Sequence, residues 1–396
     1  MALIDDILAD IARREHQRLE RAQELSISLL AGDLGSVMYL YEYSKLDSSY
    51  QPIGDKMLDR ILYRLKYKSS VQTYCNGVAG LIMGLSALQE QGFIDDFSSL
   101  LDDVDHYLDS SLDIMLQYNN HDFLHGFIGL GFYWIKRYHT SGDIAIKPLI
   151  RIIEHLQTTG EQDGKCIKWA LPESRWSKKH NISLSHGCSS TIILLCRMLE
   201  IPELIHHYSS TIKAMISGAV NYILCNQVDK KQFGCWFASS SLECEPAQRS
   251  RLAWCYGDLG VSIALYYAGL ALADEALTDL SLKVLEYAGI HRRNPEQNYV
   301  YDTCLCHGAA GIGLIFREMS KKFPSRILAN SADYWRSQVL QRVIDGDDGL
   351  TFRFYDVNSR SYQEKTSLLE GNDGVALFLL NEVAGSKLPQ LLLISN

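Results

Sequence analysis

Three side chains suited to a soft metal ion stand beside glycines in two separate parts of the sequence. Cys255 lies two residues before Gly257, and Cys306 and His307 directly precede Gly308. Zinc prefers tetrahedral coordination by nitrogen and sulfur, and three protein ligands leave a fourth position open for chemistry. The matching positions favour a zinc site over the alternative, in which each cysteine is a small buried hydrophobe.

The identity of one ligand stays open between two neighbouring cysteines. Cys304 and Cys306 are separated by a single residue, so either thiol could bind the metal. Comparison with the other glycine motifs favours Cys306, because it directly precedes His307 and Gly308.

Two more polar side chains lie beside glycines elsewhere in the chain. His186 directly precedes Gly187, and Asp122 stands four residues before Gly126. If these glycines mark equivalent positions of a repeated fold, the polar side chains gather at one end of it.

A short motif, Gly-x-x-Gly followed by an apolar run, recurs along the chain. The first glycines, together with an imperfect copy at Gly187 in which Ser190 replaces the second glycine, are Gly32, Gly77, Gly126, Gly187, Gly257, Gly308 and Gly371. Each interval has room for two helices, and repeats of this size indicate stacked supersecondary units. We discount Gly346-Asp-Asp-Gly349 as a turn.

The repeats predict an all-α protein of seven helical hairpins. In each hairpin the glycine pair opens an apolar helix that is buried, and a more charged partner helix faces solvent. Strand-like alternation is scarce. Seven pairs can form an open solenoid or a closed ring, and a ring explains the buried inner helices better. A helical solenoid that binds proteins is the alternative.

Three motifs together resemble the lanthionine synthetase C-like family. They are Trp254-Cys255-Tyr256-Gly257, Cys306-His307-Gly308, and the segment from Asn181 to His186-Gly187. The resemblance covers essentially the whole chain, because the seven repeats align with the family's seven-fold helical toroid. It implies an α/α toroid with inner and outer helix rings, and a stand-alone cyclase of class I lanthipeptide biosynthesis.

The resemblance also implies which residues hold the metal. Cys255, Cys306 and His307 match the family's zinc ligands, with one zinc ion per chain.

The same resemblance implies four catalytic residues. His186 matches an acid or base, Asp122 an acidic active-site position, and Arg251 and Tyr256 the active-site wall. Two departures bear on His186: Ser190 stands where other repeats have glycine, and His125 is a rival titratable group.

A cyclase of this kind adds a peptide cysteine to dehydroalanine or dehydrobutyrine and forms a (methyl)lanthionine thioether. A free thiol has a pKa of about 8.5, and zinc coordination deprotonates it. Attack at the β-carbon gives an enolate that needs a proton, which His186 would donate. Arg251 would stabilise the enolate oxygen, and Asp122 would orient His186 or a metal-bound histidine.

Each of three assignments has a structural alternative. Arg251 could belong to a surface or structural ion pair, Asp122 could cap a helix before Phe123, and Tyr256 could pack beside the glycine turn.

The resemblance also implies partners and a location. The substrate is a dehydrated precursor peptide with its leader, and a dehydratase and a transporter could join the cyclase in a biosynthetic complex. We expect a cytoplasmic protein that such partners could bring to the membrane.

Three rival functions remain. A relative of the family could add glutathione to dehydrated residues, using the same zinc-thiolate chemistry. Another helical toroid enzyme, such as a protein prenyltransferase subunit or a carbohydrate-processing enzyme, is the second, although prenyltransferase toroids typically have six hairpins. A non-enzymatic helical scaffold is the third and predicts no zinc.

Composition narrows the function classes. The 396 residues carry a net charge of −9 and are 47% hydrophobic. The acidic balance argues against a general nucleic-acid binder, and the apolar content argues against disorder. Asp5, Asp6 and Asp10 interrupt the N-terminal apolar residues, unlike a secretory signal, and no apolar run reaches the roughly 18 residues of a transmembrane helix. The ten cysteines are therefore expected as reduced thiols.

The spacing of the repeats predicts a single toroid domain over residues 1–396. The longest intervals leave room for small insertions at about 155–180 and 226–252. Either insertion could bind a leader peptide.

Overall fold

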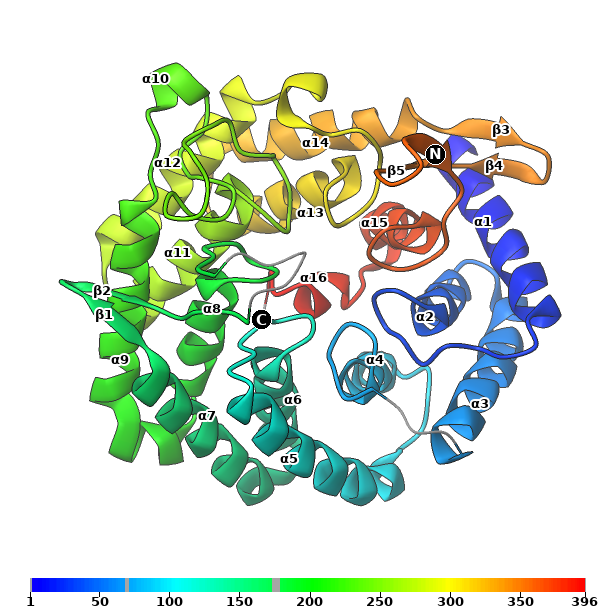
Figure 1. Ribbon diagram of the computed structural model, residues 1–396. Coiled ribbons are helices and arrows are strands. Elements are labelled where there is room, and N and C mark those ends of the chain that lie inside the picture. Colours follow the sequence, from blue (N-terminus) through cyan, green and yellow to red (C-terminus); the bar gives the residue numbers. More distant parts are fainter. Residues whose placement is uncertain (1, 68–70, 173–178, 396) are drawn as a thin grey trace. The chain divides into compact units, whose positions relative to one another are not determined.

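The computed structural model describes residues 2–67, 71–172 and 179–395 and consists mainly of α-helices (Figure 1). Two compact units make up the chain. Unit one comprises Met1–Leu101 and Val300–Asn396, and unit two comprises Asp102–Tyr299. The predicted all-α class is confirmed in both, since the sheets of the described residues are short two-stranded hairpins. The single domain over residues 1–396 stays a prediction.

Unit one contains helices from both ends of the sequence. Its α-helices are α1 (Ala2–Arg21), α2 (Asp33–Tyr43), α3 (Gln51–Tyr67), α4 (Val78–Glu90), α13 (Ala309–Ser320), α14 (Arg326–Leu340), α15 (Asn372–Ala384) and α16 (Leu388–Leu391). Its strands are β3 (Ile344–Gly346), β4 (Gly349–Thr351), β5 (Phe354–Asp356) and β6 (Ser361–Gln363), and its 3-10 helices are η1 (Ser48–Tyr50) and η2 (Ser98–Leu100). Helix α1 packs against α2, α15 and β4, so the two ends of the sequence share one core (Figure 1).

Unit two is a continuous stretch of sequence. Its α-helices are α5 (Leu101–Gln117), α6 (Phe127–Ser141), α7 (Ile146–Thr159), α8 (Cys188–Met198), α9 (Pro202–Cys225), α10 (Lys230–Phe233), α11 (Asp258–Leu272) and α12 (Glu275–His291). It also holds strands β1 (Glu161–Asp163) and β2 (Cys166–Lys168) and 3-10 helices η3 (Gly142–Ala145) and η4 (Glu296–Asn298). Helix α8 packs against α6, α9 and α11, and α11 packs against α12.

Seven helices begin directly after the first glycine of each motif, as predicted. We call these residues the signature glycines and the helices that follow them the signature helices: α2, α4, α6, α8, α11, α13 and α15. In six of them the glycine has extended backbone dihedrals. Gly257 is the exception, with φ of +80°, a conformation that glycine adopts without strain.

The glycine pair is required because backbone approaches both positions closely. A Cβ at Gly77 would lie 2.0 Å from the Val71 carbonyl oxygen, and one at Gly80 would lie 1.9 Å from the Tyr74 carbonyl oxygen. Both distances are too short for a carbon atom. Ser190, at the second position of the fourth motif, is accommodated, and its hydroxyl donates to the Gly187 carbonyl at 3.0 Å.

Burial separates the two kinds of helix. Every residue of α8 from Cys188 to Cys196 is buried, whereas α7 buries only one side, through residues such as Leu149, Ile152 and Leu156. A helix that is apolar on all sides needs packing partners on every side, and an amphipathic helix packs against it on one of these sides. The predicted division into buried and solvent-facing helices is confirmed.

The longest intervals between signature glycines contain short irregular elements. The antiparallel hairpin β1–β2 lies within residues 155–180, of which 173–178 fall outside the described residues. Helix α10 and the bridge between Gln227 and Phe237 lie within residues 226–252. Residues Gly346 to Gly349, discounted as a turn, connect β3 and β4.

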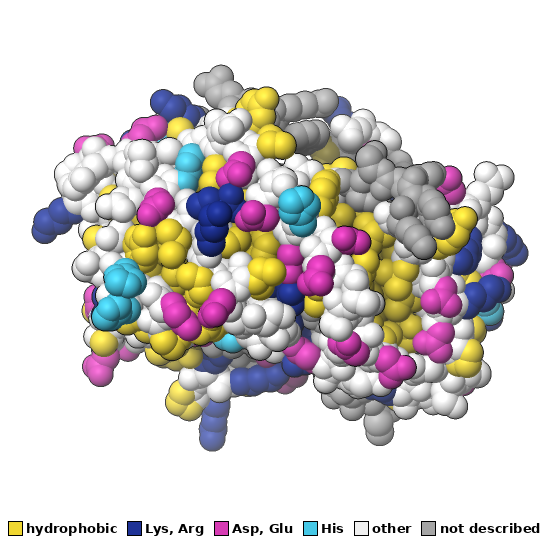
Figure 2. All heavy atoms as spheres, turned by 90° about the horizontal axis from the view of Figure 1, so that it is seen from below, with side chains coloured by type: hydrophobic (Ala, Val, Ile, Leu, Met, Phe, Trp, Pro, Cys, Tyr) yellow, Lys and Arg dark blue, Asp and Glu magenta, His cyan; other side chains and the backbone are white. Residues whose placement is uncertain are grey.

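The surface carries both signs of charge. On the face shown in Figure 2, acidic and basic side chains are interspersed between apolar patches. No helix in the described part of the chain is both long enough and apolar enough to cross a membrane.

Candidate active site

The residues that precede each signature glycine form a recurring turn, which we call the signature turn. Its repeated feature is a hydrogen bond from the amide directly before the glycine to the side chain four residues before it. Six of the seven turns have this bond, and the accepting side chains are Ser28, Thr73, Asp122, Ser183, Cys304 and Ser367. The turn before Gly257 has Ala253 at this position, which has no side-chain acceptor. In these six turns, residues at matching distances from the signature glycine therefore occupy equivalent places.

Neighbouring signature turns are joined by backbone hydrogen bonds at the residue two before the glycine. In unit one, the amide of Leu30 donates to Cys75, that of Leu369 to Leu30, and that of Cys306 to Leu369. In unit two, the Ser185 amide donates to the Cys255 carbonyl at 3.3 Å. Cys255 and Cys306 thus hold the same position in their own turns.

Unit two brings Asp122 and His186 together. His186 Nδ1 lies 2.6 Å from Asp122 Oδ2, and the two side chains are only 18% and 9% exposed. The alternative that Asp122 caps a helix before Phe123 is wrong, because α6 begins after Gly126. Asp122 instead holds the preceding turn through Oδ1, which accepts the amide of His125 at 2.8 Å, and holds the histidine through Oδ2.

The hydrogen bond shifts the pKa values of both partners in opposite directions. Burial works to raise the pKa of Asp122, but the hydrogen bond and charge of His186 outweigh it and lower the pKa. Burial works to lower the pKa of His186, but Asp122 outweighs it and raises the pKa, with a further contribution from Cys255. Since Nδ1 faces the carboxylate, Nε2 is the ring nitrogen that can transfer a proton.

Cys255 and Tyr256 adjoin this pair. Cys255 is buried, at 4% exposure, and its carbonyl accepts the amides of Leu184 and Ser185. The Tyr256 ring lies 5.9 Å from the His186 ring, measured between centroids. Four of the predicted site residues are therefore neighbours in unit two.

Arg251 precedes Cys255 by four residues and is half-buried. Its guanidinium has no hydrogen bond or ion pair with any residue that the structure describes. This argues against the alternative of a structural ion pair within the described chain.

His125, the rival titratable group, differs from His186 in its surroundings. Its amide, rather than its ring, contacts Asp122. Desolvation lowers the pKa of His125, although the charge of Asp122 opposes the change. His186 is therefore the better proton carrier of the two.

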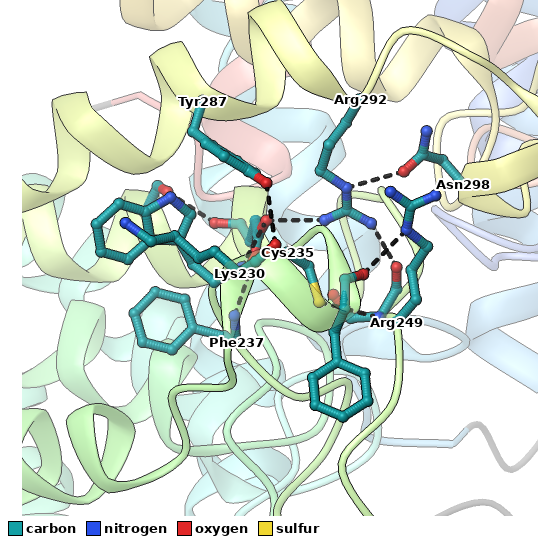
Figure 3. Close-up of polar contacts among 12 residues, drawn as sticks. Lys230, Cys235, Phe237, Arg249, Tyr287, Arg292 and Asn298 are labelled. Carbon is teal, nitrogen blue, oxygen red and sulfur yellow. Dashed lines mark hydrogen bonds and ion pairs between the residues drawn. The ribbon is translucent and has the colours of Figure 1, made fainter.

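Asp258 fixes the turn that carries Cys255. Its carboxylate accepts the amides of Trp236 and Phe237, each at 3.0 Å, and pairs with Arg292 Nη1 at 2.8 Å (Figure 3). The side chains of Asp258 and Arg292 are both fully buried. A buried ion pair with these additional hydrogen bonds holds its geometry firmly.

Arg292 extends the same network to the start of the turn. It donates to Asn298 Oδ1 at 2.8 Å and to the Ser250 carbonyl (Figure 3). Ser250 directly precedes Arg251, so this single guanidinium supports both ends of the segment that carries Arg251 and Cys255.

Unit one contains the second part of the predicted metal site. His307 Nε2 lies 4.0 Å from Asp302 Oδ2, and Asp302 accepts the amides of Cys304 and Tyr355 at 3.0 and 3.1 Å. One potential ligand atom from each of Asp302, Cys304 and His307 lies within 4.8 Å of the others. This group could hold a metal ion.

The geometry separates the roles of the two cysteines. Cys304 is buried, its sulfur accepts the His307 amide at 3.4 Å, and burial raises its pKa to about 11. That is the place of the accepting turn residue, which is serine or threonine in four other turns. Cys306 is less buried and directly precedes His307. Its role as the ligand stays a prediction.

The two supporting aspartates were not predicted from the sequence. Asp302 stands six residues before Gly308, and Asp258 directly follows Gly257. Their spacing to a signature glycine could have identified them in the sequence. Cys255 belongs to unit two while Cys306 and His307 belong to unit one, and their joint coordination of a metal stays a prediction.

Comparison with known proteins gives consistent matches. The nisin biosynthesis protein NisC of Lactococcus lactis subsp. lactis is 24% identical over 357 residues, covering 81% of this chain and 82% of that protein. A solved structure of a nisin cyclase has a TM-score of 0.75 at 19% identity and covers 98% of this chain and 96% of that one. This match shows the fold and confirms the predicted α/α toroid class.

Residues 23–393 match the family described as lanthionine synthetase C-like protein. The matched range takes in all seven signature turns and every candidate site residue. The chain belongs to the lanthionine synthetase C-like family.

Proposed function

We propose that this protein is a zinc-dependent cyclase that forms (methyl)lanthionine rings in a dehydrated precursor peptide. The observation that carries the proposal is the 2.6 Å contact between Asp122 and His186 beside Cys255, in a chain of this family. The two relatives, named for nisin biosynthesis and as a nisin cyclase, support the same substrate class. The precursor's leader, a dehydratase and a transporter are partners in this proposal, which places the cyclase in the cytoplasm.

The residues proposed to hold zinc have suitable chemistry. Cys255, Cys306 and His307 offer two thiols and an imidazole, a set that zinc prefers. All three stand one or two residues before a signature glycine, and Asp302 Oδ2 lies 4.0 Å from His307 Nε2. Zinc bound there would keep a substrate thiol deprotonated at neutral pH.

The proposed reaction forms one carbon–sulfur bond. The peptide thiolate attacks the β-carbon of the dehydrated residue, and the electron pair moves to the enolate. His186 then donates the proton on Nε2 to the α-carbon, and Asp122 holds the imidazole in position through Nδ1. We assign to Arg251, whose guanidinium has no partner among the described residues, the stabilisation of the enolate oxygen. Tyr256 lines the site beside the His186 ring.

Metal analysis of single variants tests the zinc site. We expect about one zinc per chain in the wild type and loss of zinc from folded Cys255→Ala, Cys306→Ala and His307→Ala. Cys75→Ala is the matched control, because Cys75 holds the same position in another signature turn and should leave zinc unchanged. Retention of zinc in all three ligand variants would place the metal elsewhere.

A competition assay separates cyclisation from glutathione addition. The enzyme is given a dehydrated peptide with free cysteines, with and without glutathione, and products are resolved by mass spectrometry after thiol alkylation. Intramolecular rings leave the mass unchanged and block alkylation. Glutathione adducts in place of rings would replace the cyclase proposal with the second function.

A further inference from the structure

A pair of cysteine thiols lies in unit two, outside the candidate active site. Cys166 is on β2, and Cys225 is the last residue of α9. Their sulfur atoms are 3.4 Å apart. Cys225 is exposed and Cys166 is partly exposed, so both can be reached from solvent.

The surrounding contacts hold the two thiols together. Strand β2 packs on α9, and a Cβ at Gly218 would come within 2.4 Å of the Ile167 side chain. The Asn221 side-chain amide donates to the Lys165 carbonyl at 3.0 Å. The residues on both sides of Cys166 are therefore fixed to α9, and the sulfur–sulfur approach is part of this packing.

We propose that Cys166 and Cys225 are a redox-active pair, which low-molecular-weight disulfides such as oxidised glutathione convert to a protein disulfide. The pair has no third metal ligand among the described residues, which favours sulfur–sulfur chemistry over metal binding.

The oxidation proceeds by two exchanges. The Cys225 thiolate attacks one sulfur of oxidised glutathione, forms a mixed disulfide and releases one glutathione. The Cys166 thiolate then attacks the Cys225 sulfur and releases the second glutathione. Two protein thiols are oxidised, one small disulfide is reduced, and the two thiol protons end on the released glutathiones or in solvent.

The order of attack follows from the environment of each sulfur. Cys166 is only partly exposed, and desolvation together with the hydrogen bond with Cys225 raises its pKa. Cys225 is more exposed and meets the small disulfide first. Cys166 reacts second because its partner sulfur is already adjacent.

Several other cysteines lack these features. Burial raises the pKa of Cys196 to about 12 and that of Cys304 to about 11. Cys244 is partly exposed, but its thiol donates to the His180 carbonyl at 3.5 Å. Cys244 therefore provides a matched control of intermediate exposure.

The disulfide would link residues 59 positions apart in sequence. The closed segment contains α8 and His186, so the bond would restrict the unfolded chain across that repeat. We therefore expect the oxidised protein to melt at a higher temperature than the reduced protein.

The test incubates the full-length protein with oxidised glutathione at mildly alkaline pH and maps peptides without reduction. We expect a Cys166–Cys225 cross-linked peptide, reversed by dithiothreitol. The Cys166→Ser variant should accumulate one glutathione on Cys225, several-fold more than the wild type. Cys225→Ser should give neither product, and Cys244→Ser should behave as the wild type.

Three results would overturn the proposal. The first is that both thiols remain alkylatable in the folded wild type after incubation. The second is that Cys166→Ser accumulates no more glutathione at Cys225 than the wild type. The third is cross-linking of Cys225 to other cysteines as readily as to Cys166. Circular dichroism of each serine variant confirms that it is folded.

Discussion

At the scale of single residues, Asp122 shows how a structural position becomes part of a site. Four other signature turns place serine or threonine at this position, and their hydroxyl oxygen accepts the same amide hydrogen bond. A carboxylate accepts this amide with one oxygen, and its second oxygen is available for another partner. In Asp122 the second oxygen holds His186. The additional oxygen distinguishes this turn from a merely structural one.

The first prediction concerns the charge of Asp122. In Asp122→Asn an amide oxygen can still accept the His125 amide, but the negative charge beside His186 is lost. We expect kcat on a dehydrated peptide to fall roughly 10–100-fold. Zinc content should be unchanged. Ser183→Ala, which removes the equivalent turn hydrogen bond next to His186, is the comparison for a purely structural effect. Unchanged kcat in Asp122→Asn would remove the carboxylate from the proposed proton transfer.

The second prediction concerns His121, which is 1% exposed. Burial lowers the pKa of His121 to about 4, although the charge of Asp122 opposes the change. Unfolded histidine takes up its proton near pH 6.5, so between pH 6.5 and 4 the unfolded state binds a proton that the folded state does not. The free energy of unfolding should therefore fall by up to about 3 kcal/mol from this group as the pH drops across that window.

Urea unfolding at several pH values measures this dependence. His121→Phe should have a flatter profile between pH 6.5 and 4 than the wild type. His106→Phe, at an exposed position of α5, should keep the wild-type slope. Equal slopes in all three proteins would show that His121 does not exclude the proton.

At the scale of elements, the Gly-Asp-Leu-Gly motif explains how a turn is tied to a distant helix. The motif occurs at Gly32 and Gly257, and in both copies the aspartate pairs with an arginine. Asp33 pairs with Arg18 of α1 at 2.6 Å, and Asp258 pairs with Arg292, directly after α12, at 2.8 Å. The same four residues therefore anchor a signature turn in each unit.

The third prediction concerns the arginine of the second copy. Arg292→Met leaves the fully buried Asp258 without its cation, and we expect a loss of about 3–5 kcal/mol in unfolding free energy. The neighbouring Arg293→Met, at a partly exposed position, is the matched control and should cost far less. Urea unfolding followed by circular dichroism measures both. A loss of similar size in the two variants would contradict the anchoring role of Arg292.

Helix starts were predictable from sequence, whereas the arginine partners were not. A glycine at a helix start is a local requirement, because the carbonyl oxygens of the preceding turn leave no room for a Cβ. The requirement is therefore visible as a glycine in the sequence motif. Arg18 lies 15 residues before Asp33, and Arg292 lies 34 residues after Asp258. Their separations differ in sign and length, so the motif gives no indication of either partner.

At the scale of the whole molecule, the fold class could be predicted from the repeat, but which segments of the chain make up each unit could not. Seven glycine motifs predict seven buried helices because the pattern is periodic. Unit one joins the first 101 residues to the last 97, and this depends on tertiary contacts of α1 with α15 and β4. One of those contacts is the hydrogen bond that the Leu350 amide donates to the Asp10 carboxylate, which no local sequence pattern predicts.

The last prediction tests whether α1 belongs to the core of unit one. Leu8 is fully buried, and its carbonyl accepts the Tyr39 hydroxyl at 2.6 Å, whereas Leu3, on the same helix, is 46% exposed. Leu8→Ala should lower the unfolding free energy by about 2–5 kcal/mol, because the deleted methyl groups leave a cavity between packed helices. Leu3→Ala should change it by no more than about 0.5 kcal/mol. The two substitutions remove the same atoms from one helix, so they differ only in the burial of the site. Equal losses of unfolding free energy in urea would mean that α1 is not packed on α2 and α15. A clearly larger loss for Leu8→Ala would show that the N-terminal helix is part of the core of unit one.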